Sequence, residues 1–285
     1  MLKDNARYKD LILEPGTFVP EVFDDYPVDD PYVRLYQPVY DREFTVDENY
    51  PFVDDSLADR WLHFWAYPAI LYGVQRLRLL FAWGMKVEGR SWLRKYRKQL
   101  KGGAITVCNH CHRADAEAVL LAVRANRHTK IPMFAPNFAT KDQKLLKAVG
   151  GVPIPPPEAG MAAMKKFNQA FDEFHRRGYW FHIFPESCKW NFYKPLRPFQ
   201  KGAFTMSYKY GMPIVPCMIV WRERKGLFKW FGPKNTPLLT LRIGEPVIPD
   251  TSAVRKVEVE RILRLTHERM CRLGGIVKNT WPAME

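Results

Sequence analysis

A histidine and an aspartate five residues apart are the residues of this chain best suited to chemistry. His110 and Asp115 lie in the segment Asn-His-Cys-His-Arg-Ala-Asp, residues 109–115. The apolar run Ala104–Cys108 precedes this segment and a mostly apolar stretch follows it, so we expect it to join a buried strand to a helix. At this spacing the carboxylate can accept a hydrogen bond from one imidazole nitrogen and leave the other free as a base.

Such a pair is suited to taking a proton from a hydroxyl group. The carboxylate fixes the tautomer of the imidazole and raises its basicity. No serine in a nucleophile-elbow context accompanies the pair, so we expect the base to activate a substrate hydroxyl rather than a protein nucleophile. The spacing alone is a weak signal, because a histidine that caps a helix gives the same pattern.

Four further segments strengthen this signal by their order along the chain. They are Val149–Ile154, Phe184–Lys189, Phe199–Ala203 and Pro213–Pro216. Together with residues 109–115, they resemble the signature blocks of the 1-acyl-glycerol-3-phosphate acyltransferase family, within the wider glycerolipid acyltransferases. The first block of that family is Asn-His-x4-Asp, and the third is Phe-Pro-Glu-Gly-Thr-Arg, which aligns with Phe-Pro-Glu-Ser-Cys-Lys here.

The resemblance implies an enzyme that moves a fatty acyl group from acyl-CoA or acyl carrier protein to the free hydroxyl of a lysophospholipid. The acceptor it favours is lysophosphatidate, which would give phosphatidate. In this reading His110 removes the hydroxyl proton, while Asp115 orients the imidazole and stabilises the imidazolium. No metal or bound organic cofactor is expected, because the thioester donor is already activated.

The resemblance also implies a site for the glycerol phosphate of the acceptor. Basic side chains suit this site, because charge-assisted hydrogen bonds hold a phosphate dianion best. The candidate substrate-binding residues are Glu186, Lys189, Arg197, Lys201 and Lys141.

Several positions depart from the family pattern. No arginine follows Ile154, where the second block often ends in one that contacts phosphate. Lys189 replaces an arginine, and Ser187 replaces a glycine, which would strain any turn with positive φ. His112 stands where serine is usual. These departures leave open an acceptor with another headgroup, or a catalytically inactive membrane-bound adaptor.

Residues 102–285 alternate short apolar runs with amphipathic stretches. This alternation predicts an α/β catalytic domain with a mixed, largely parallel sheet flanked by helices. The expected strands are 104–108, 131–135, 152–154, 179–184, 214–220 and 238–243. The expected helices are 114–125, 140–148, 161–177, 201–210 and 254–271.

Residues 59–101 are expected to attach the protein to a membrane. Only 15 residues separate Arg60 from Arg76 in the most apolar stretch, which is short of the roughly 20 that a spanning helix needs. Two short amphipathic helices in the bilayer interface, or a re-entrant hairpin, fit better than a span. The basic segment 86–101 that follows suits an anionic membrane surface. We therefore expect a peripheral or monotopic protein at the cytoplasmic face of the cell membrane. Helices buried against the domain are the alternative.

Residues 1–58 form an acidic arm interrupted by prolines. Residues 1–60 carry 6 basic and 15 acidic side chains, whereas residues 61–285 carry 38 basic and 15 acidic ones. We expect the arm to lie as an extended strap on the basic body, because opposite charges attract. A mostly disordered arm is the alternative.

The composition excludes two broad classes of protein. An apolar fraction of 47% and an aromatic fraction of 14% exclude a fully disordered chain. Five cysteines in 285 residues exclude a small disulfide-stapled secreted protein. The first ten residues have no apolar core of a signal peptide, so a reducing cytoplasm is expected.

Three weaker alternatives concern the chemistry. Metal-ligand residue types crowd residues 108–112, but no second cysteine pair accompanies them, so no metal site is expected. A nucleophile at Cys111 or Cys188 would be activated by His110. The basic and aromatic loop 221–231 has the composition of a nucleic-acid binding loop, but nucleic-acid binding would leave the ordered segments unexplained.

Overall fold

A mixed sheet of seven strands forms the centre of the computed structural model, which describes residues 8–21, 25–36, 39–61, 64–65, 67–123, 129–230, 232–233 and 236–284. In chain order its strands are β2 (Lys86–Glu88), β3 (Ile105–Cys108), β4 (Thr129–Phe134), β5 (Gly151–Ile154), β6 (Trp180–Ile183), β7 (Ile214–Arg222) and β8 (Leu238–Ile243). Their order across the sheet is β2-β8-β7-β3-β6-β4-β5. Neighbours are parallel except β7 and β8, which are antiparallel. The expected mixed, largely parallel α/β sheet is confirmed.

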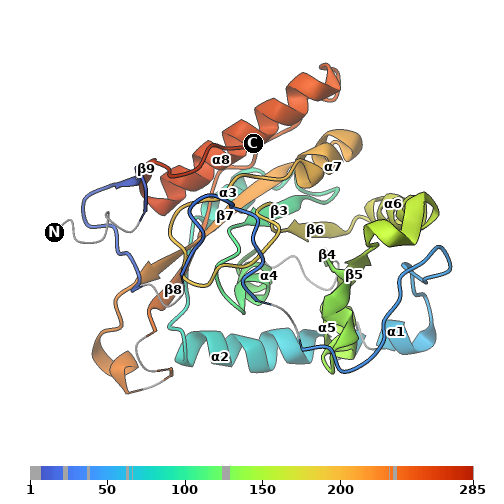
Figure 1. Cartoon of the computed structure of the whole chain (residues 1–285), viewed down its shortest axis with the longest axis horizontal. Coiled ribbons are helices and arrows are strands. Elements are labelled where there is room, and N and C mark those ends of the chain that lie inside the picture. Colours follow the sequence, from blue (N-terminus) through green and yellow to red (C-terminus); the bar gives the residue numbers. More distant parts are fainter. Residues whose placement is uncertain are drawn as a thin grey trace.

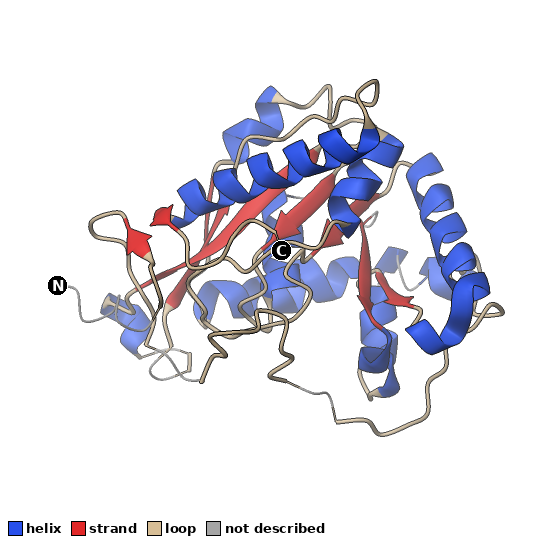
Figure 2. Ribbon diagram, turned by 45° about the horizontal axis from the view of Figure 1, so that its top comes forward, coloured by secondary structure: helices blue, strands red, loops and turns tan. Residues whose placement is uncertain are grey.

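Helices cover both faces of this sheet (Figures 1 and 2). The apolar side chains of α6 (Gly160–Arg176), α7 (Gly202–Tyr210) and α8 (Arg255–Gly274) belong to one buried cluster. Those of η3 (Ala69–Gln75), α2 (Arg76–Phe81) and α4 (Asp115–Val123) belong to a second cluster. Because both faces are covered, the central strands are mostly apolar, and all four residues of β3 are buried.

The remaining elements are short. They are β1 (Ile12–Leu13), α1 (Leu57–Trp61), α3 (Arg90–Lys95), η4 (Ala135–Ala139), α5 (Gln143–Ala148), η5 (Pro157–Ala159), η6 (Gly226–Lys229) and β9 (Ile276–Lys278). Strand β1 pairs with β9 in a separate antiparallel ribbon, which ties the arm to the C-terminal segment.

The sheet begins before residue 102, where the sequence places the start of the catalytic domain. Strand β2 lies within residues 59–101 and pairs in parallel with β8 at the edge of the sheet. The buried side chains Tyr67, Leu71, Leu79 and Trp83 also fix this segment to the domain. A three-residue strand is too short for its period to be recognised in the sequence.

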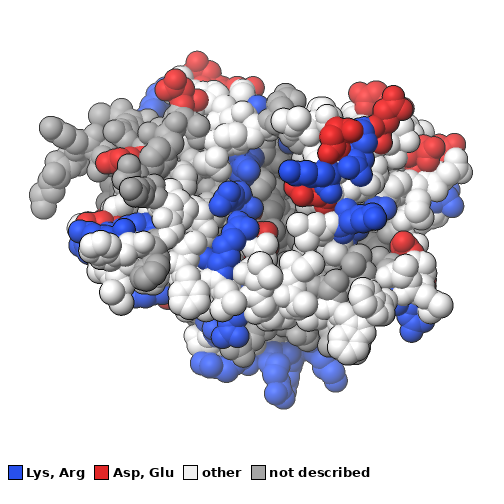
Figure 3. Space-filling view, turned by 90° about the horizontal axis from the view of Figure 1, so that it is seen from below, with Lys and Arg blue, Asp and Glu red and all other residues white. Residues whose placement is uncertain are grey.

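The opposite side of η3 and α2 is apolar and exposed. Val74, Leu77 and Phe81 are spaced three and four residues apart, so they share one helical face, and each is more than half exposed. Figure 3 views the molecule from this side, where Lys and Arg side chains gather along the lower edge. None of the helices in the described residues is both long and apolar enough to cross a membrane.

The described part of the acidic arm lies on the body as an extended strap, as expected. Its side chains Tyr8, Leu11, Val46 and Phe52 are buried in the cluster under α6, α7 and α8. Arg177 donates two hydrogen bonds to the carboxylate of Asp55, at 2.6 and 2.8 Å. Apolar burial and opposite charge therefore both hold the arm in place.

Candidate active site

His110 and Asp115 meet at the carboxyl edge of the sheet, where open α/β sheets bind their ligands. His110 lies on the loop after β3, and Asp115 is the first residue of α4. The distance between His110 Nδ1 and Asp115 Oδ2 is 2.6 Å. Asp115 Oδ1 also accepts a 2.8 Å hydrogen bond from the backbone N–H of Ala116. The five-residue spacing allows this contact because His110 lies on the loop after β3 and Asp115 lies on the first turn of α4.

Asp115 is held as a carboxylate although it is buried. Burial opposes its ionisation, but the charge and hydrogen bond of His110 outweigh this and lower the pKa of Asp115. An ionised Asp115 accepts a hydrogen bond from the Nδ1–H group of His110 and stabilises a positive imidazole.

The imidazole of His110 is fixed in orientation but open on one side. Its ring stacks on Phe184, the residue after β6, with centroids 4.0 Å apart and planes 13° apart. The side chain is 23% exposed, and among the described residues Nε2 has no hydrogen-bond partner. The free nitrogen can therefore take a proton from a bound substrate.

Asn109 attaches the His110 loop to the neighbouring strand. Its Oδ1 accepts a 2.8 Å hydrogen bond from the N–H of Ile219 on β7, and its Nδ2 donates to the carbonyl of Ile219 at 3.1 Å. The side chain thus continues the pairing of β3 and β7 beyond the last strand residue. Sequence reasoning named Asn109 only as part of a motif, and its partner 110 residues away could not be read from local spacing.

Glu186 and Arg197 hold the loop from the other side. Glu186 Oε2 accepts a 2.9 Å hydrogen bond from the backbone N–H of His110, and Oε1 accepts one of 3.0 Å from the backbone N–H of Arg197. The Arg197 guanidinium pairs with Glu186 at 3.1 Å, and both side chains are buried. This charge-assisted pair fixes the backbone beside the imidazole.

Glu186 and Arg197 were both expected to bind substrate, and the structure places them inside the protein instead. The Arg197 side chain has no exposed surface, and its guanidinium also donates to the carbonyls of Pro31 and Cys188. Its face lies 4.6 Å from the ring of Trp190. Arg197 is therefore not placed to reach an acceptor phosphate. It orders the loop that carries Glu186.

The three predicted lysines lie in different places. Lys189 is half-buried on the loop after β6, with Nζ 5.2 Å from the ring centroid of Tyr36. Lys201 is exposed at the start of α7, and Lys141 is exposed between η4 and α5. Of the three, Lys189 lies on the loop whose Glu186 binds the backbone of His110.

His112 is a buried neighbour of the dyad whose role the sequence did not indicate. Its ring packs on Trp83 and Trp221, at centroid distances of 4.2 and 5.5 Å. Its Nδ1 accepts a 3.2 Å hydrogen bond from the N–H of Ala114. Burial lowers the pKa of His112 to about 4, so this imidazole is neutral at pH 7.

The cysteines near the dyad are poorly suited to act as nucleophiles, and they are also poorly suited to bind a metal ion. Burial raises the pKa of the Cys108 and Cys111 thiols well above the usual range, so both are thiols rather than thiolates at pH 7. Cys188 is also buried, and its Sγ donates to the carbonyl of Tyr32. Over the described residues, no group of three or more His, Cys, Asp and Glu side chains could hold a metal ion.

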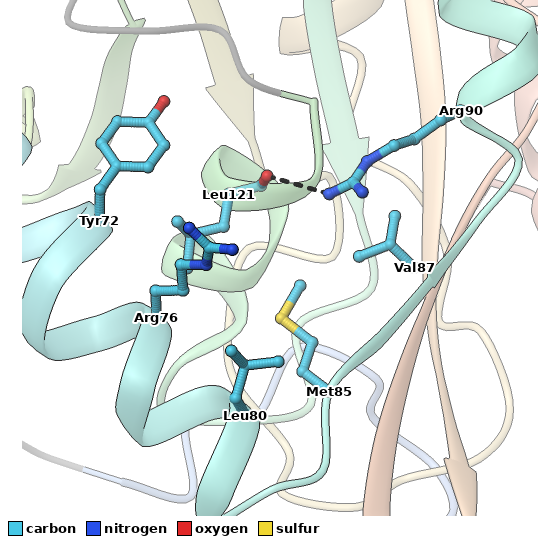
Figure 4. A pocket seen from close by; sticks show the side chains of 7 residues that line it. All are labelled: Tyr72, Arg76, Leu80, Met85, Val87, Arg90 and Leu121. Carbon is cyan, nitrogen blue, oxygen red and sulfur yellow. Dashed lines mark hydrogen bonds between the residues drawn. The ribbon is translucent and has the colours of Figure 1, made fainter.

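A groove of about 580 Å³ lies beside the C-terminal part of α4 (Figure 4). Arg90 crosses it to donate a 3.0 Å hydrogen bond to the carbonyl of Ala122, and Arg76 points into it from α2. Leu121 is six residues from Asp115 along α4, or about 9 Å along the helix axis, and neither His110 nor Asp115 lines the groove. Its lining residues are Tyr72, Arg76, Leu80, Met85, Val87, Arg90 and Leu121.

The dyad lies within a segment that matches a known family. Residues 84–220 match the family model described as Acyltransferase. This segment is an acyltransferase domain. The relationship expected from the ordered blocks is thereby confirmed, and the domain contains both His110 and Asp115.

Solved structures also resemble this chain. One of them is the 1-acyl-sn-glycerophosphate acyltransferase PlsC from Thermotoga maritima, which is 20% identical in sequence, with a TM-score of 0.47. The match covers 76% of this chain and 84% of that chain. No curated protein matches the chain significantly.

Proposed function

We propose that the protein transfers a fatty acyl group from acyl-CoA or acyl carrier protein to the free hydroxyl of a lysophospholipid. The acceptor proposed is lysophosphatidate, and the product is phosphatidate. The observation that carries the proposal is the 2.6 Å bond between His110 and Asp115 within an acyltransferase domain. It leaves Nε2 of a partly exposed imidazole for the acceptor hydroxyl.

The proposed reaction begins with proton transfer from the acceptor hydroxyl to Nε2 of His110. The oxygen attacks the thioester carbonyl carbon and forms a tetrahedral intermediate. The carbon–sulfur bond then breaks, and the leaving thiolate takes the proton from the imidazolium. Asp115 stabilises the positive imidazole between the two proton transfers.

The test is acyl transfer by the purified full chain from labelled acyl-CoA, and separately from acyl carrier protein, to lysophosphatidate, lysophosphatidylcholine and a monoacylglycerol. We expect His110→Ala to lower turnover on the order of 10³-fold, within the range for loss of a general base. His175→Ala is the matched control, because His175 lies on α6 and stacks on Tyr210, outside the dyad.

The acceptor panel separates the parts of the proposal. Transfer to lysophosphatidate that is abolished in His110→Ala supports both the acceptor and the base. Transfer only to another acceptor supports the base and contradicts the headgroup. Equal turnover in wild type and His110→Ala contradicts the mechanism, and no transfer from either donor contradicts the activity.

We also propose that the protein attaches to the cytoplasmic face of the cell membrane as a peripheral or monotopic protein. The exposed apolar face formed by Val74, Leu77 and Phe81 supports this. The basic segment 86–101 follows directly in the sequence, and its arginines and lysines would meet anionic headgroups. Buried apolar area and opposite charge would then act together.

A further inference from the structure

The N-terminal strap is attached to the loop that follows β6. Backbone carbonyls of the strap accept hydrogen bonds from side chains of that loop. Tyr26 stacks on Trp190, with ring centroids 5.6 Å apart and planes 18° apart. The bonds are Arg197 Nη1 to Pro31 O at 3.1 Å, Cys188 Sγ to Tyr32 O at 3.2 Å and Trp190 Nε1 to Val33 O at 2.8 Å.

The same loop is bonded to the loop that carries the catalytic base. The N–H of Trp190 donates to the carbonyl of His110 at 3.0 Å, and the N–H of Phe192 donates to the carbonyl of Cys111 at 2.9 Å. The strap, the loop after β6 and the His110 loop therefore form a continuous set of contacts. The strap is a wall of the active site rather than a remote appendage.

This wall brings an arginine to the carboxyl edge of the sheet. The Arg34 guanidinium lies 3.7 Å from the ring centroid of Phe134, the last residue of β4. Strand β4 is two strands from β3 in the sheet, which is about 10 Å at the usual strand spacing. Arg34 is half-buried, and no carboxylate in the described residues forms an ion pair with it.

A second cation lies against the same stretch of strap. Lys189 Nζ is placed over the ring of Tyr36, two residues beyond Arg34, and Lys189 also has no ion-pair partner within the described ranges. Two unneutralised cations at one rim of a site attract an anion and favour a doubly charged one. A guanidinium can also bind two phosphate oxygens at once.

We propose that Arg34 binds the phosphate of the acyl acceptor, with Lys189 as a second contact. The ligand is a phosphate monoester, and the strap supplies the guanidinium. The inference rests on the proposed function and deepens it, because it names the residue that selects a phosphate-bearing acceptor. Phe134 pairs with Ile154 across β4 and β5, so Arg34 lies near Ile154. Prolines follow Ile154 in this chain, where the second block of the family often ends in an arginine.

The kinetic test compares wild type, Arg34→Gln and Arg34→Lys with lysophosphatidate and with a monoacylglycerol of the same chain length. We expect Arg34→Gln to raise KM for lysophosphatidate by about 10- to 100-fold, the range for one charge-assisted contact, and to leave KM for the monoacylglycerol unchanged. Arg34→Lys should recover part of the loss, because a point charge replaces a two-pronged contact.

The matched control is Arg42→Gln. Arg42 is also an arginine of the arm, but its Nε is bonded to Asp41 at 2.9 Å and it is exposed. It should leave KM for both acceptors unchanged. Equal losses with both acceptors in Arg34→Gln would assign Arg34 to holding the strap, and no loss with either would remove it from the site; both results overturn the proposal.

Binding gives a readout that does not depend on turnover. A short-chain lysophosphatidate below its micelle concentration is titrated into the full chain by calorimetry. We expect Arg34→Gln to weaken its binding by about tenfold or more relative to Arg42→Gln. This result supports the phosphate site even when wild type transfers no acyl group, whereas equal binding by the two variants overturns the site even when transfer occurs.

Discussion

The imidazole of His110, which we propose as the catalytic base, is positioned by residues from other elements of the fold. Glu186 fixes the backbone of His110, Phe184 supports its ring, and Asn109 ties its loop to β7. In the proposed mechanism, each contact limits the rotation of Nε2 away from the acceptor hydroxyl. Positioning of this kind contributes strongly to rate, because a misplaced base loses its alignment with the attacking oxygen.

Ser187 stores backbone strain beside Glu186. Its φ is +63°, in the left-handed region that glycine adopts freely, as the usual glycine at this position leads one to expect. Ser187→Gly should relieve that strain and raise the free energy of unfolding by about 0.5–1 kcal/mol, after the greater flexibility of glycine in the unfolded chain is deducted. Urea denaturation at pH 7 measures the change.

The control for this prediction is Ser187→Ala. Alanine removes the hydroxyl, which donates to the carbonyl of Glu186 at 2.7 Å, but keeps the Cβ atom that causes the strain. It should therefore not stabilise the protein. A glycine variant no more stable than the alanine variant would show that the turn carries no strain.

The sequence predicts contacts between side chains when both lie on one turn, as the five-residue spacing of His110 and Asp115 shows. It cannot predict contacts that the fold creates between distant residues. Arg197 reads as a surface cation that could bind phosphate, yet it bonds the carbonyl of Pro31, 166 residues away, and is fully buried. Arg34 gave no local signal for the same reason.

Among the elements, η3 and α2 have two apolar sides with different partners. Leu71 and Leu79 face the core, whereas Leu77 and Phe81 face outward. Replacing Leu77 and Phe81 together by serine should therefore leave the fold intact and weaken binding to vesicles of phosphatidylglycerol and phosphatidylcholine by about tenfold or more, because two large apolar side chains no longer enter the interface. Vesicle sedimentation measures the binding.

The matched control for the membrane face replaces Val254 and Val257 by serine. These valines are 71% and 65% exposed at the start of α8, on the other face of the sheet. They should leave vesicle binding unchanged. If both double variants bind like wild type, the face of η3 and α2 is not the attachment surface.

The long elements follow from the sequence and the short ones do not. The helix expected at 161–177 spans Gly160–Arg176, and the strand expected at 238–243 has those bounds. Amphipathic spacing over several turns, or a full apolar strand, gives such elements a clear period. Strands β1, β2 and β9 have two or three residues each and form through tertiary pairing, so no local pattern marks them.

At the scale of the whole molecule, the acidic arm and the basic body attract each other where the arm packs on the body. The net charge of +14 combines an acidic arm with a strongly basic body. The arm covers part of that body and is bonded to it through Asp55 and Arg177. Within the body, folding also buries several histidines in their neutral form.

These buried histidines should make stability fall as the pH drops below about 6.5, the pKa of histidine in the unfolded chain. Burial lowers the pKa of His112 and His267 to about 4, so the folded protein holds them neutral. Between these values the unfolded chain binds protons that the folded protein does not, and stability falls by up to about 1.4 kcal/mol per pH unit for each histidine. Urea denaturation from pH 7.5 to pH 4.5 measures the slope of the free energy of unfolding against pH. His267→Gln should reduce this slope by about the contribution of one histidine. Burial also lowers the pKa of His175, but this side chain is only half-buried and can bind a proton at the surface, so His175→Gln should reduce the slope less. Equal slopes in wild type and His267→Gln would show that His267 takes up its proton without unfolding.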